Sequence, residues 1–389
     1  MTVLEGKNIP RLLACVFLVA IFFAAFPLTI RKDMSDFGVC YKAGQRILAG
    51  ETLYRASDGH LQYKYAPAAA DIYALFSFMP WEIAKILWYL LSLLILAGVA
   101  ALSYKVIPTP KKKAVILVGL TILIMSKYIG RELQLGQVNI LIIFLLTAAA
   151  SLFLAKRDLW AGVIWGVSLF LKPYALVFLP YFALKRRWKA LAGGAATVLV
   201  GFLIPVMNYG FQGNAIVLKE WFSSLSQSTP RLLAVGDNAS LFAVVLKVTR
   251  GQLTLGAMAA LALGAGLIGL ALLIMMFRKK TNGAGEREVC ELAYLMVLIP
   301  LFSPLGWNYN YIYGFLAVMI LLNTLRRFSW GLRAVAVANF VLIGGTLREI
   351  LGKDLFRFYT RNSFIAWSFL LVLALLVLLQ LKPWRSSDA

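Results

Sequence analysis

Long apolar runs separated by short polar segments make up most of this chain. A helix needs about 20 residues to cross a hydrocarbon core of ~30 Å. The apolar runs predict helices near residues 11–30, 82–104, 114–127, 138–155, 189–207, 254–277, 289–302, 311–325, 330–346 and 363–381. In lipid the backbone must satisfy its own hydrogen bonds, so this pattern indicates an all-α polytopic membrane protein.

The segment 159–184 departs from this pattern. Basic residues flank it on both sides, and its apolar halves around Lys172 and Pro173 are each too short for a full span. Proline interrupts a helix, so the segment predicts a short helical hairpin, whose two arms bring the expected number of membrane helices to about twelve. Gly162 and Gly166 would let a neighbouring helix approach one arm closely.

Charge sets the expected orientation. The chain carries 39 basic and 17 acidic residues, a net charge of +22, yet most basic residues lie in short loops beside apolar runs. This arrangement is typical of cytoplasmic loops, so no nucleic-acid partner is expected. Both termini are then inside, the first apolar run is a retained helix, and the outward stretches are 31–80, 128–137, 208–250, 303–310 and 347–362.

The first outward stretch carries a candidate general base. Read as a helix, residues 36–48 place Phe37, Cys40, Tyr41, Gly44, Ile47 and Leu48 on one face, with Gly50 as the stop. Asp36 sits at the edge of that face, where a carboxylate could reach an incoming hydroxyl. Equally, Asp33, Ser35 or Asp36 could simply cap the helix.

Basic residues in apolar or outward segments are candidates for binding phosphate. Lys172 could face a phosphate group, or it could extend to the interface without a role. A few basic residues lie in the outward segments although most basic residues are expected in cytoplasmic loops. They are Arg131 and Arg348, together with Lys127, Arg231, Lys353, Arg357 and Arg361. These residues pair with Glu132, Glu349 or Asp354, or else hold an anionic lipid or a lipid diphosphate.

Two polar segments stand at the start of membrane helices. One is "GRELQLGQVN", with Arg131, Gln134, Gln137 and Asn139, and the other is "SPLGWNYNY", with Trp307, Asn308, Tyr309 and Asn310. Amides on sugar hydroxyls and aromatic rings on sugar faces would make a glycan site. A helix cap or an interfacial aromatic belt uses the same residue types.

The sequence contains few residues and motifs that could form a cofactor site. Of three cysteines, Cys15 and Cys290 lie in apolar runs and Cys40 stands alone in an outward segment, while the single histidine, His60, is in a polar loop. The sequence has no Walker, GxSxG or HExxH motif. No cofactor is expected, although Asp33 beside Asp36 leaves a divalent metal ion open.

Several blocks together resemble one enzyme family. "DFGVCYKAGQRILAGETLY" is similar to an Asp-Phe-x-x-x-Tyr-x-Ala-Gly first-loop signature, and "YKYAP", "GQVN", "GVSLFLKPYALVFLP" and "SPLGW" follow in order. In these blocks the chain resembles the polyprenyl-phosphate-sugar-dependent glycosyltransferases of family 87, in the GT-C superfamily. It departs from them after Ser-Pro-x-x-Trp, where relatives often have histidines and Tyr309 and Asn310 stand here.

The resemblance implies a GT-C fold in a single membrane domain, 1–389, with a catalytic first loop that contains amphipathic helices. Asp36 would be the base and Lys172 would line the cavity for the donor, a polyprenyl-phosphate-linked sugar. Arg131 and Arg348 are expected at the donor phosphate; the residues expected at the sugar or at a lipid or glycan acceptor are Tyr41, Tyr63, Tyr65, Gln137, Asn139, Trp307, Asn308 and Asn310.

The implied reaction is a single inverting displacement, with mannose or another hexose transferred at the outer face of a cell membrane, a bacterial inner membrane above all. The competing hypothesis is a transporter or flippase of lipid-linked sugars, which would use the same basic, aromatic cavity without breaking a bond. The third hypothesis is an assembly scaffold, which predicts that no outward polar residue is individually essential.

Overall fold

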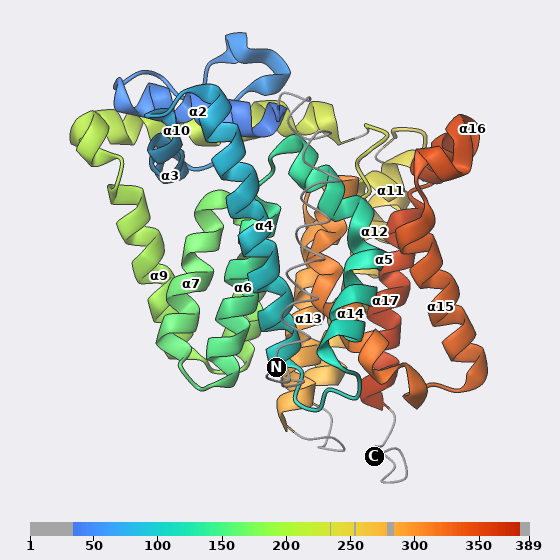
Figure 1. Cartoon of the computed structure of the whole chain (residues 1–389). Coiled ribbons are helices and arrows are strands. Elements are labelled where there is room, and N and C mark those ends of the chain that lie inside the picture. Colours follow the sequence, from blue (N-terminus) through green and yellow to red (C-terminus); the bar gives the residue numbers. More distant parts are fainter. Residues whose placement is uncertain (1–33, 234, 253, 278–283, 382–389) are drawn as a thin grey trace, which may run out of the picture. The chain divides into compact units, whose positions relative to one another are not determined.

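The computed structural model describes residues 34–233, 235–252, 254–277 and 284–381, and within these ranges the chain is helical, with one isolated β-bridge between Asn238 and Trp307 (Figure 1). It divides into two compact units. Unit 1 comprises Met1–Leu102 and Gly130–Ser228, and unit 2 comprises Ser103–Ile129 and Thr229–Ala389. The predicted first helix, 11–30, lies outside the described residues.

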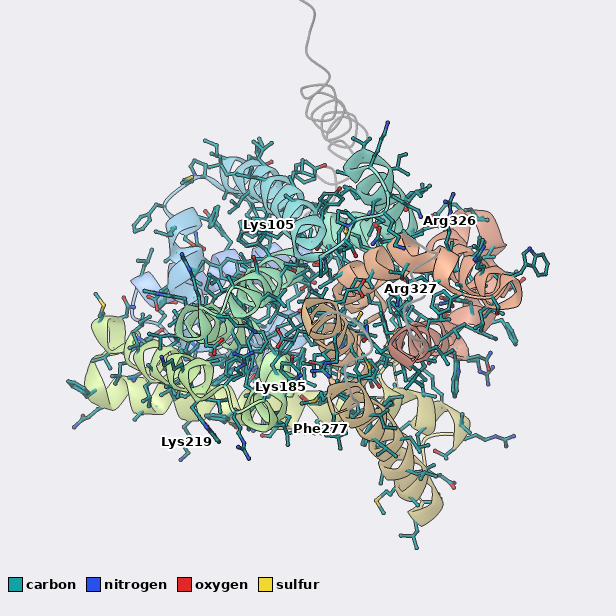
Figure 2. The ribbon with its side chains drawn as sticks, turned by 90° about the horizontal axis from the view of Figure 1, so that it is seen from below. Lys105, Lys185, Lys219, Phe277, Arg326 and Arg327 are labelled. Carbon is teal, nitrogen blue, oxygen red and sulfur yellow. The ribbon has the colours of Figure 1, made fainter. Side chains whose placement is uncertain are left out.

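Unit 1 contains the first polar segment and the predicted hairpin. Its elements are α2 (Ser35–Leu48), η1 (Ala56–Leu61), α3 (Pro67–Ser77), most of α4 (Trp81–Val106), the end of α5 (Ala114–Leu135), α6 (Asn139–Leu154), α7 (Asp158–Leu171), η2 (Pro173–Val177), α8 (Phe178–Leu184), α9 (Trp188–Leu203) and most of α10 (Val206–Leu232). Lys185, labelled in Figure 2, directly follows α8 in the chain.

Unit 2 contains the remaining helices. They are the first part of α5, then α11 (Leu241–Val248), α12 (Leu255–Phe277), α13 (Ala284–Phe302), η3 (Asn308–Gly314), α14 (Phe315–Thr324), η4 (Leu325–Arg327), α15 (Trp330–Gly345), α16 (Arg348–Arg361) and α17 (Phe364–Leu381). Arg326 and Arg327 lie in η4, directly after α14 (Figure 2).

The helices confirm a polytopic membrane protein. Among the described residues four helices, α4, α5, α12 and α17, are long and apolar enough to cross a bilayer. The number rises to six if each bent pair is one span: α9 with α10, bent by 94°, and α15 with α16, bent by 100°. The apolar helices α6, α7 and η2–α8 are shorter. The expected total of twelve stays a prediction.

Two predicted boundaries were wrong for identifiable reasons. Helix α5 was expected to end near residue 127 but continues to Leu135, because Arg131, Glu132 and Gln134 are good helix formers despite their polarity. It stops before Gly136, whose φ of +67° is outside the helical region. The expected span 189–207 instead breaks between Leu203 and Val206, next to Pro205.

The predicted hairpin is confirmed. Helix α7 ends at Leu171, Lys172 is extended (φ −151°, ψ 125°), and the chain turns back through η2 and α8. Gly162 and Gly166 act as expected, because α9 packs directly against them: a Cβ at Gly162 would overlap the carbonyl group of Ala190, and one at Gly166 would be 2.7 Å from Cβ of Thr197. This close packing fixes α7, and with it the place where Lys172 leaves the helix.

Candidate active site

The turn between α5 and α6 is held against α2 by close packing. A Cβ at Gly136 would lie 2.6 Å from Cβ of Phe37 and 2.9 Å from Cε of Met34, and its positive φ also favours glycine. Trp88 donates its indole N–H to the Gly136 carbonyl (3.0 Å), and its ring stacks on that of Phe37 at 5.1 Å. These contacts place the next residue, Gln137, opposite the start of α2.

Asp36 lies at this junction. It is the second residue of α2, whose N-cap is Met34, so neither Ser35 nor Asp36 caps the helix. The half-buried carboxylate accepts a hydrogen bond from Nε2 of Gln137 and a longer one from the Ser35 hydroxyl (3.4 Å). A carboxylate in the first turn also interacts favourably with the helix dipole. Asp36 is therefore a partly accessible carboxylate in a defined orientation.

Lys172 points inward and does not extend to the interface. The residue is 9% exposed, and its Nζ donates to Oδ1 of Asn139 (2.8 Å) and Oε1 of Gln137 (3.2 Å). The ring of Tyr65 lies under the ammonium group, with its centroid 5.9 Å from Nζ. An ammonium group has three N–H bonds. The acceptors found in the described part of the chain use two of them, which leaves one direction for an anionic ligand.

Glu132 completes a continuous line of hydrogen bonds. Its carboxylate is fully buried, and Oε1 accepts from Nδ2 of Asn139 (2.6 Å). The line runs Asp36–Gln137–Lys172–Asn139–Glu132. It leads from α2 through the α5–α6 turn to the hairpin, and from there back through α6 to α5. Sequence reasoning treated Glu132 only as a partner for an outward arginine. Arg131 instead is exposed and donates to Gln134 (2.7 Å).

The "YKYAP" block contributes to the same site. The Tyr65 hydroxyl donates to Oε1 of Gln137 (3.4 Å), so this predicted residue joins the line. Its neighbour Lys64 was missed by sequence reasoning, although a lysine between two tyrosines of an outward segment was a visible signal. Burial lowers the pKa of Lys64, and the charge of Asp36 partly offsets that shift. Lys64 is thus a half-buried cation within electrostatic range of Asp36.

Other predicted residues of unit 1 lie in packing interactions. The Tyr41 hydroxyl donates to the Met79 carbonyl (2.7 Å), and that of Tyr63 donates to the Ala66 carbonyl (3.3 Å). Cys40 is buried in α2, on the apolar face predicted for that helix, and burial raises the pKa of its thiol. A protonated, buried thiol is a poor nucleophile.

The "SPLGW" block lies in unit 2. Asn238 accepts the backbone N–H of Gly306 (3.0 Å) and donates to the Pro304 carbonyl (2.9 Å), which pins the block to the residues before α11. Asn310 is buried and donates to the Leu305 carbonyl (3.1 Å). Trp307 and Asn308 are half-buried, and Arg348 is exposed at the start of α16.

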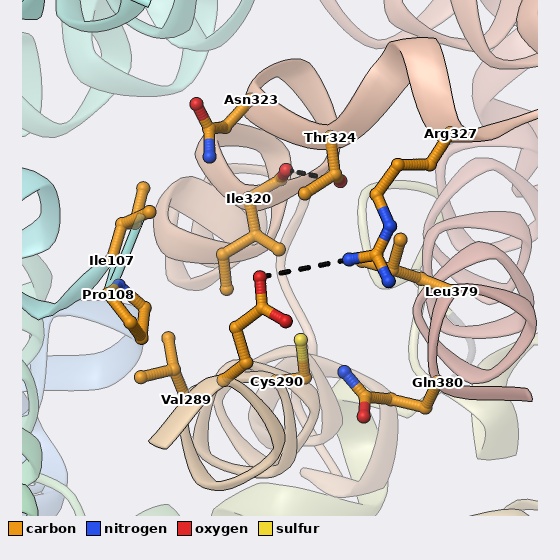
Figure 3. Close-up of a pocket in the computed structure, with 11 residues that line it drawn as sticks. Ile107, Pro108, Val289, Cys290, Ile320, Asn323, Thr324, Arg327, Leu379 and Gln380 are labelled. Carbon is orange, nitrogen blue, oxygen red and sulfur yellow. Dashed lines mark hydrogen bonds and ion pairs between the residues drawn. The ribbon is translucent and has the colours of Figure 1, made fainter. Parts of the chain in front are cut away.

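A small pocket in unit 2 contains none of the predicted site residues. Figure 3 shows it between α13, α14 and α17, where Glu286 pairs with Arg327 at 3.7 Å. Cys290, Asn323 and Gln380 also line it. Among the described residues no three His, Cys, Asp or Glu side chains converge to hold a metal ion, and Asp33 is not among those residues.

Comparison with known proteins gives consistent matches. The model of glycosyltransferase family 87 matches residues 63–304. A polyprenol-phosphate-mannose-dependent alpha-(1-2)-phosphatidylinositol mannoside mannosyltransferase of Mycobacterium tuberculosis is 23% identical over 370 residues, 89% of this chain and 81% of that protein. A protein of the same description from Mycolicibacterium smegmatis is 24% identical over 266 residues, 64% of this chain and 57% of that protein. The family match contains Gln137, Asn139 and Lys172, whereas Asp36 precedes it.

Proposed function

Because this chain belongs to glycosyltransferase family 87, we propose that it transfers a hexose, mannose above all, from a polyprenyl-phosphate donor to a lipid or glycan acceptor. The relatives depend on polyprenol phosphate mannose, as their names say. The observation that carries the proposal is the link from Asp36 through Gln137 to Lys172. This link connects a carboxylate that could accept a proton with a cation that could bind a phosphate. Transfer of a sugar from a sugar phosphate requires both functions.

In the proposed reaction Asp36 is the general base. Its carboxylate takes the proton of the acceptor hydroxyl while the hydroxyl oxygen forms a bond to the anomeric carbon of the sugar. The bond from that carbon to the donor phosphate oxygen breaks, and its electron pair leaves with polyprenyl phosphate. A single displacement of this kind inverts the configuration at the anomeric carbon.

Lys172 would stabilise the departing phosphate. Charge develops on the phosphate oxygens as the bond breaks, and a preorganised ammonium group in a site with little water stabilises such charge strongly. Tyr65, Gln137 and Asn139 hold this cation and are proposed to border the sugar. Arg131 and Arg348 as phosphate ligands, and Tyr41, Tyr63, Trp307, Asn308 and Asn310 as sugar or acceptor contacts, stay predictions.

The proposed setting is a cell membrane with the site on the outer face. The basic loops support both termini inside and twelve membrane helices, with residues 31–80 outside. A bacterial inner membrane, with the site facing the periplasm, is the proposed location.

The test is sugar transfer by purified protein in liposomes supplied with polyprenyl-phosphate mannose and a phosphatidylinositol mannoside. We expect release of polyprenyl phosphate, and a fall in turnover on the order of 10²-fold or more in Asp36→Asn. Asparagine keeps an oxygen for Gln137 but accepts no proton, so donor binding and thermal stability should persist.

Asp58→Asn is the matched control. Asp58 belongs to the same outward segment but pairs with Arg46 (2.5 Å), so its loss should leave turnover unchanged. Normal turnover in Asp36→Asn would remove the base assignment. Donor that crosses the bilayer without release of polyprenyl phosphate would identify a transporter instead.

A further inference from the structure

The hydrogen bonds around Lys172 are nearly symmetric. On one side Gln137 lies between the lysine and Asp36, and on the other Asn139 lies between the lysine and Glu132. Each amide accepts from the ammonium group with its oxygen and donates its NH₂ group to a carboxylate. The Asp36 carboxylate is half-buried and belongs to the proposed reaction, whereas the Glu132 carboxylate is fully buried.

Burial of Glu132 is costly and needs an explanation. Oε2 has no hydrogen-bond partner among the described residues, and the hydrogen bonds that Glu132 accepts there come from the side-chain amide and the backbone N–H of Asn139. Burying a carboxylate without full pairing costs several kcal/mol of folding free energy, so the protein would be more stable with an apolar residue at this position of α5. Both hydrogen bonds come from Asn139, and Asn139 in turn accepts from Lys172, so the cost of burying Glu132 points to a role at that lysine.

The chemistry of the groups fixes the orientation of Asn139. A lysine ammonium group only donates, so the amide must turn its oxygen toward Lys172. The NH₂ group then points to Glu132, whose Oε1 accepts it in either protonation state of the acid. Without Glu132 this NH₂ group would lose the acceptor toward which it points, and the amide would lose a contact that orients it.

The orientation of Asn139 determines the direction of the lysine. Two amide oxygens, one from Gln137 and one from Asn139, take two of the three N–H bonds of a tetrahedral ammonium group. Together they fix the direction of the third. With one amide displaced, the group could rotate about the remaining hydrogen bond, and the third N–H would no longer have a defined direction.

We propose that Glu132 is a positioning residue which, through Asn139, sets the direction in which Lys172 presents its ammonium group to the donor phosphate. This proposal rests on the proposed function, because it assumes that Lys172 binds that phosphate. Glu132 and Asn139 flank the Gly136 turn, so both ends of the contact are held by the same short piece of chain.

The experiment measures binding of polyprenyl phosphate to the whole protein, with thermal stability and the separate values of kcat and KM. Glu132→Met removes the acceptor at similar length, and Asn139→Ala removes the link. We expect each to weaken binding about tenfold, or about 1.4 kcal/mol, because each removes a hydrogen bond that orients a group bonded to the ammonium. KM for the donor should rise more than kcat falls. Glu132→Gln keeps an acceptor oxygen and should bind within about threefold of wild type.

The double variant Glu132→Met/Asn139→Ala separates positioning from general stability. If Glu132 acts only through Asn139, the double variant binds no more weakly than either single one. Losses that multiply in the double variant overturn the proposal. Unchanged affinity in Asn139→Ala overturns it as well, and that arm remains informative if Glu132→Met fails to fold.

A matched control exists in the same unit. Asp71 accepts from Nδ2 of Asn208 (2.7 Å) and also has a buried oxygen without a partner in the described structure, so Asp71→Leu removes a comparable carboxylate–asparagine pair. The affinity of Asp71→Leu for polyprenyl phosphate should be unchanged.

Lys172→Met separates the proposed donor site from the proposed role of Glu132. If this variant binds polyprenyl phosphate normally, the proposed donor site fails. If only this variant binds weakly, the role of Glu132 fails and the donor site stands.

Discussion

At the scale of single residues, Gln137 joins the two groups that the sequence singled out separately. Its NH₂ group donates to Asp36, and its oxygen accepts from both Lys172 and Tyr65. A neutral amide can face an anion and a cation at once, because it has a donor end and an acceptor end. Gln137 therefore bridges the carboxylate and the ammonium group, and in the proposed reaction both groups remain available to the substrate.

Lys172 should recognise the phosphate of the donor and not its sugar. Lys172→Met keeps the length and apolar character of the side chain but removes the charge, so we expect binding of polyprenyl phosphate and of the full donor to weaken by the same factor, about tenfold or more. Titration calorimetry or a fluorescent polyprenyl-phosphate analogue would measure this. Lys185→Met, in the basic loop after α8, is the control. A larger loss for the full donor than for polyprenyl phosphate would place Lys172 at the sugar.

Sequence reasoning found residues with unusual surroundings and missed residues with hidden partners. Asp36 and Lys172 were visible as a polar residue beside an apolar face and a cation within an apolar segment. The place of Glu132 at the site was not visible, because nothing in the sequence shows that its helix turn is buried. The sequence also does not show that its partner is Asn139, seven residues later. The Tyr41 hydroxyl bonds to the Met79 carbonyl, a choice that depends on packing between distant segments, and the Tyr63 hydroxyl bonds to the Ala66 carbonyl just after it in the chain.

At the scale of elements, the hairpin depends on glycine. We expect Gly162→Ala to destabilise the protein by about 1–3 kcal/mol, because the new methyl group would overlap the Ala190 carbonyl and α9 would have to move. Gly264→Ala in α12 is the control, since a Cβ there meets no atom within 4 Å. Thermal unfolding in detergent would compare the two. Equal stability of both variants would show that α7 and α9 are less tightly packed than the structure indicates.

Helix positions could be predicted where apolar length decides them, as for α4, α6, α12, α15 and α17. The prediction failed where backbone geometry decides instead. Polar residues extend α5 until Gly136 ends it, and the chain bends by 94° between α9 and α10 although the hydropathy pattern continues there. Hydropathy reports transfer to lipid, and it does not report which of two helical directions the backbone takes.

At the scale of the whole molecule, the loop charges predict on which side of the membrane each end of helix α6 lies. Helix α6 runs from Asn139, beside Lys172, to Leu154, so its 16 residues span about 24 Å at ~1.5 Å per residue. That length is comparable to a hydrocarbon core of ~30 Å. The basic pair Lys156 and Arg157 follows directly, at the opposite end of the helix from the candidate site. If that pair is inside, the site must be outside or near the outer surface.

Cysteine labelling tests this topology directly. In a protein whose three cysteines, Cys15, Cys40 and Cys290, have been replaced by alanine, Ser57→Cys and Ala155→Cys each introduce one exposed thiol by a small change. A membrane-impermeant maleimide added to intact cells should label Ser57→Cys, and it should label Ala155→Cys only after the membrane is permeabilised. Labelling of both thiols from outside would reject the predicted orientation. Labelling of Ala155→Cys alone would invert it, and an active site facing the cytoplasm would then require a donor presented from that side.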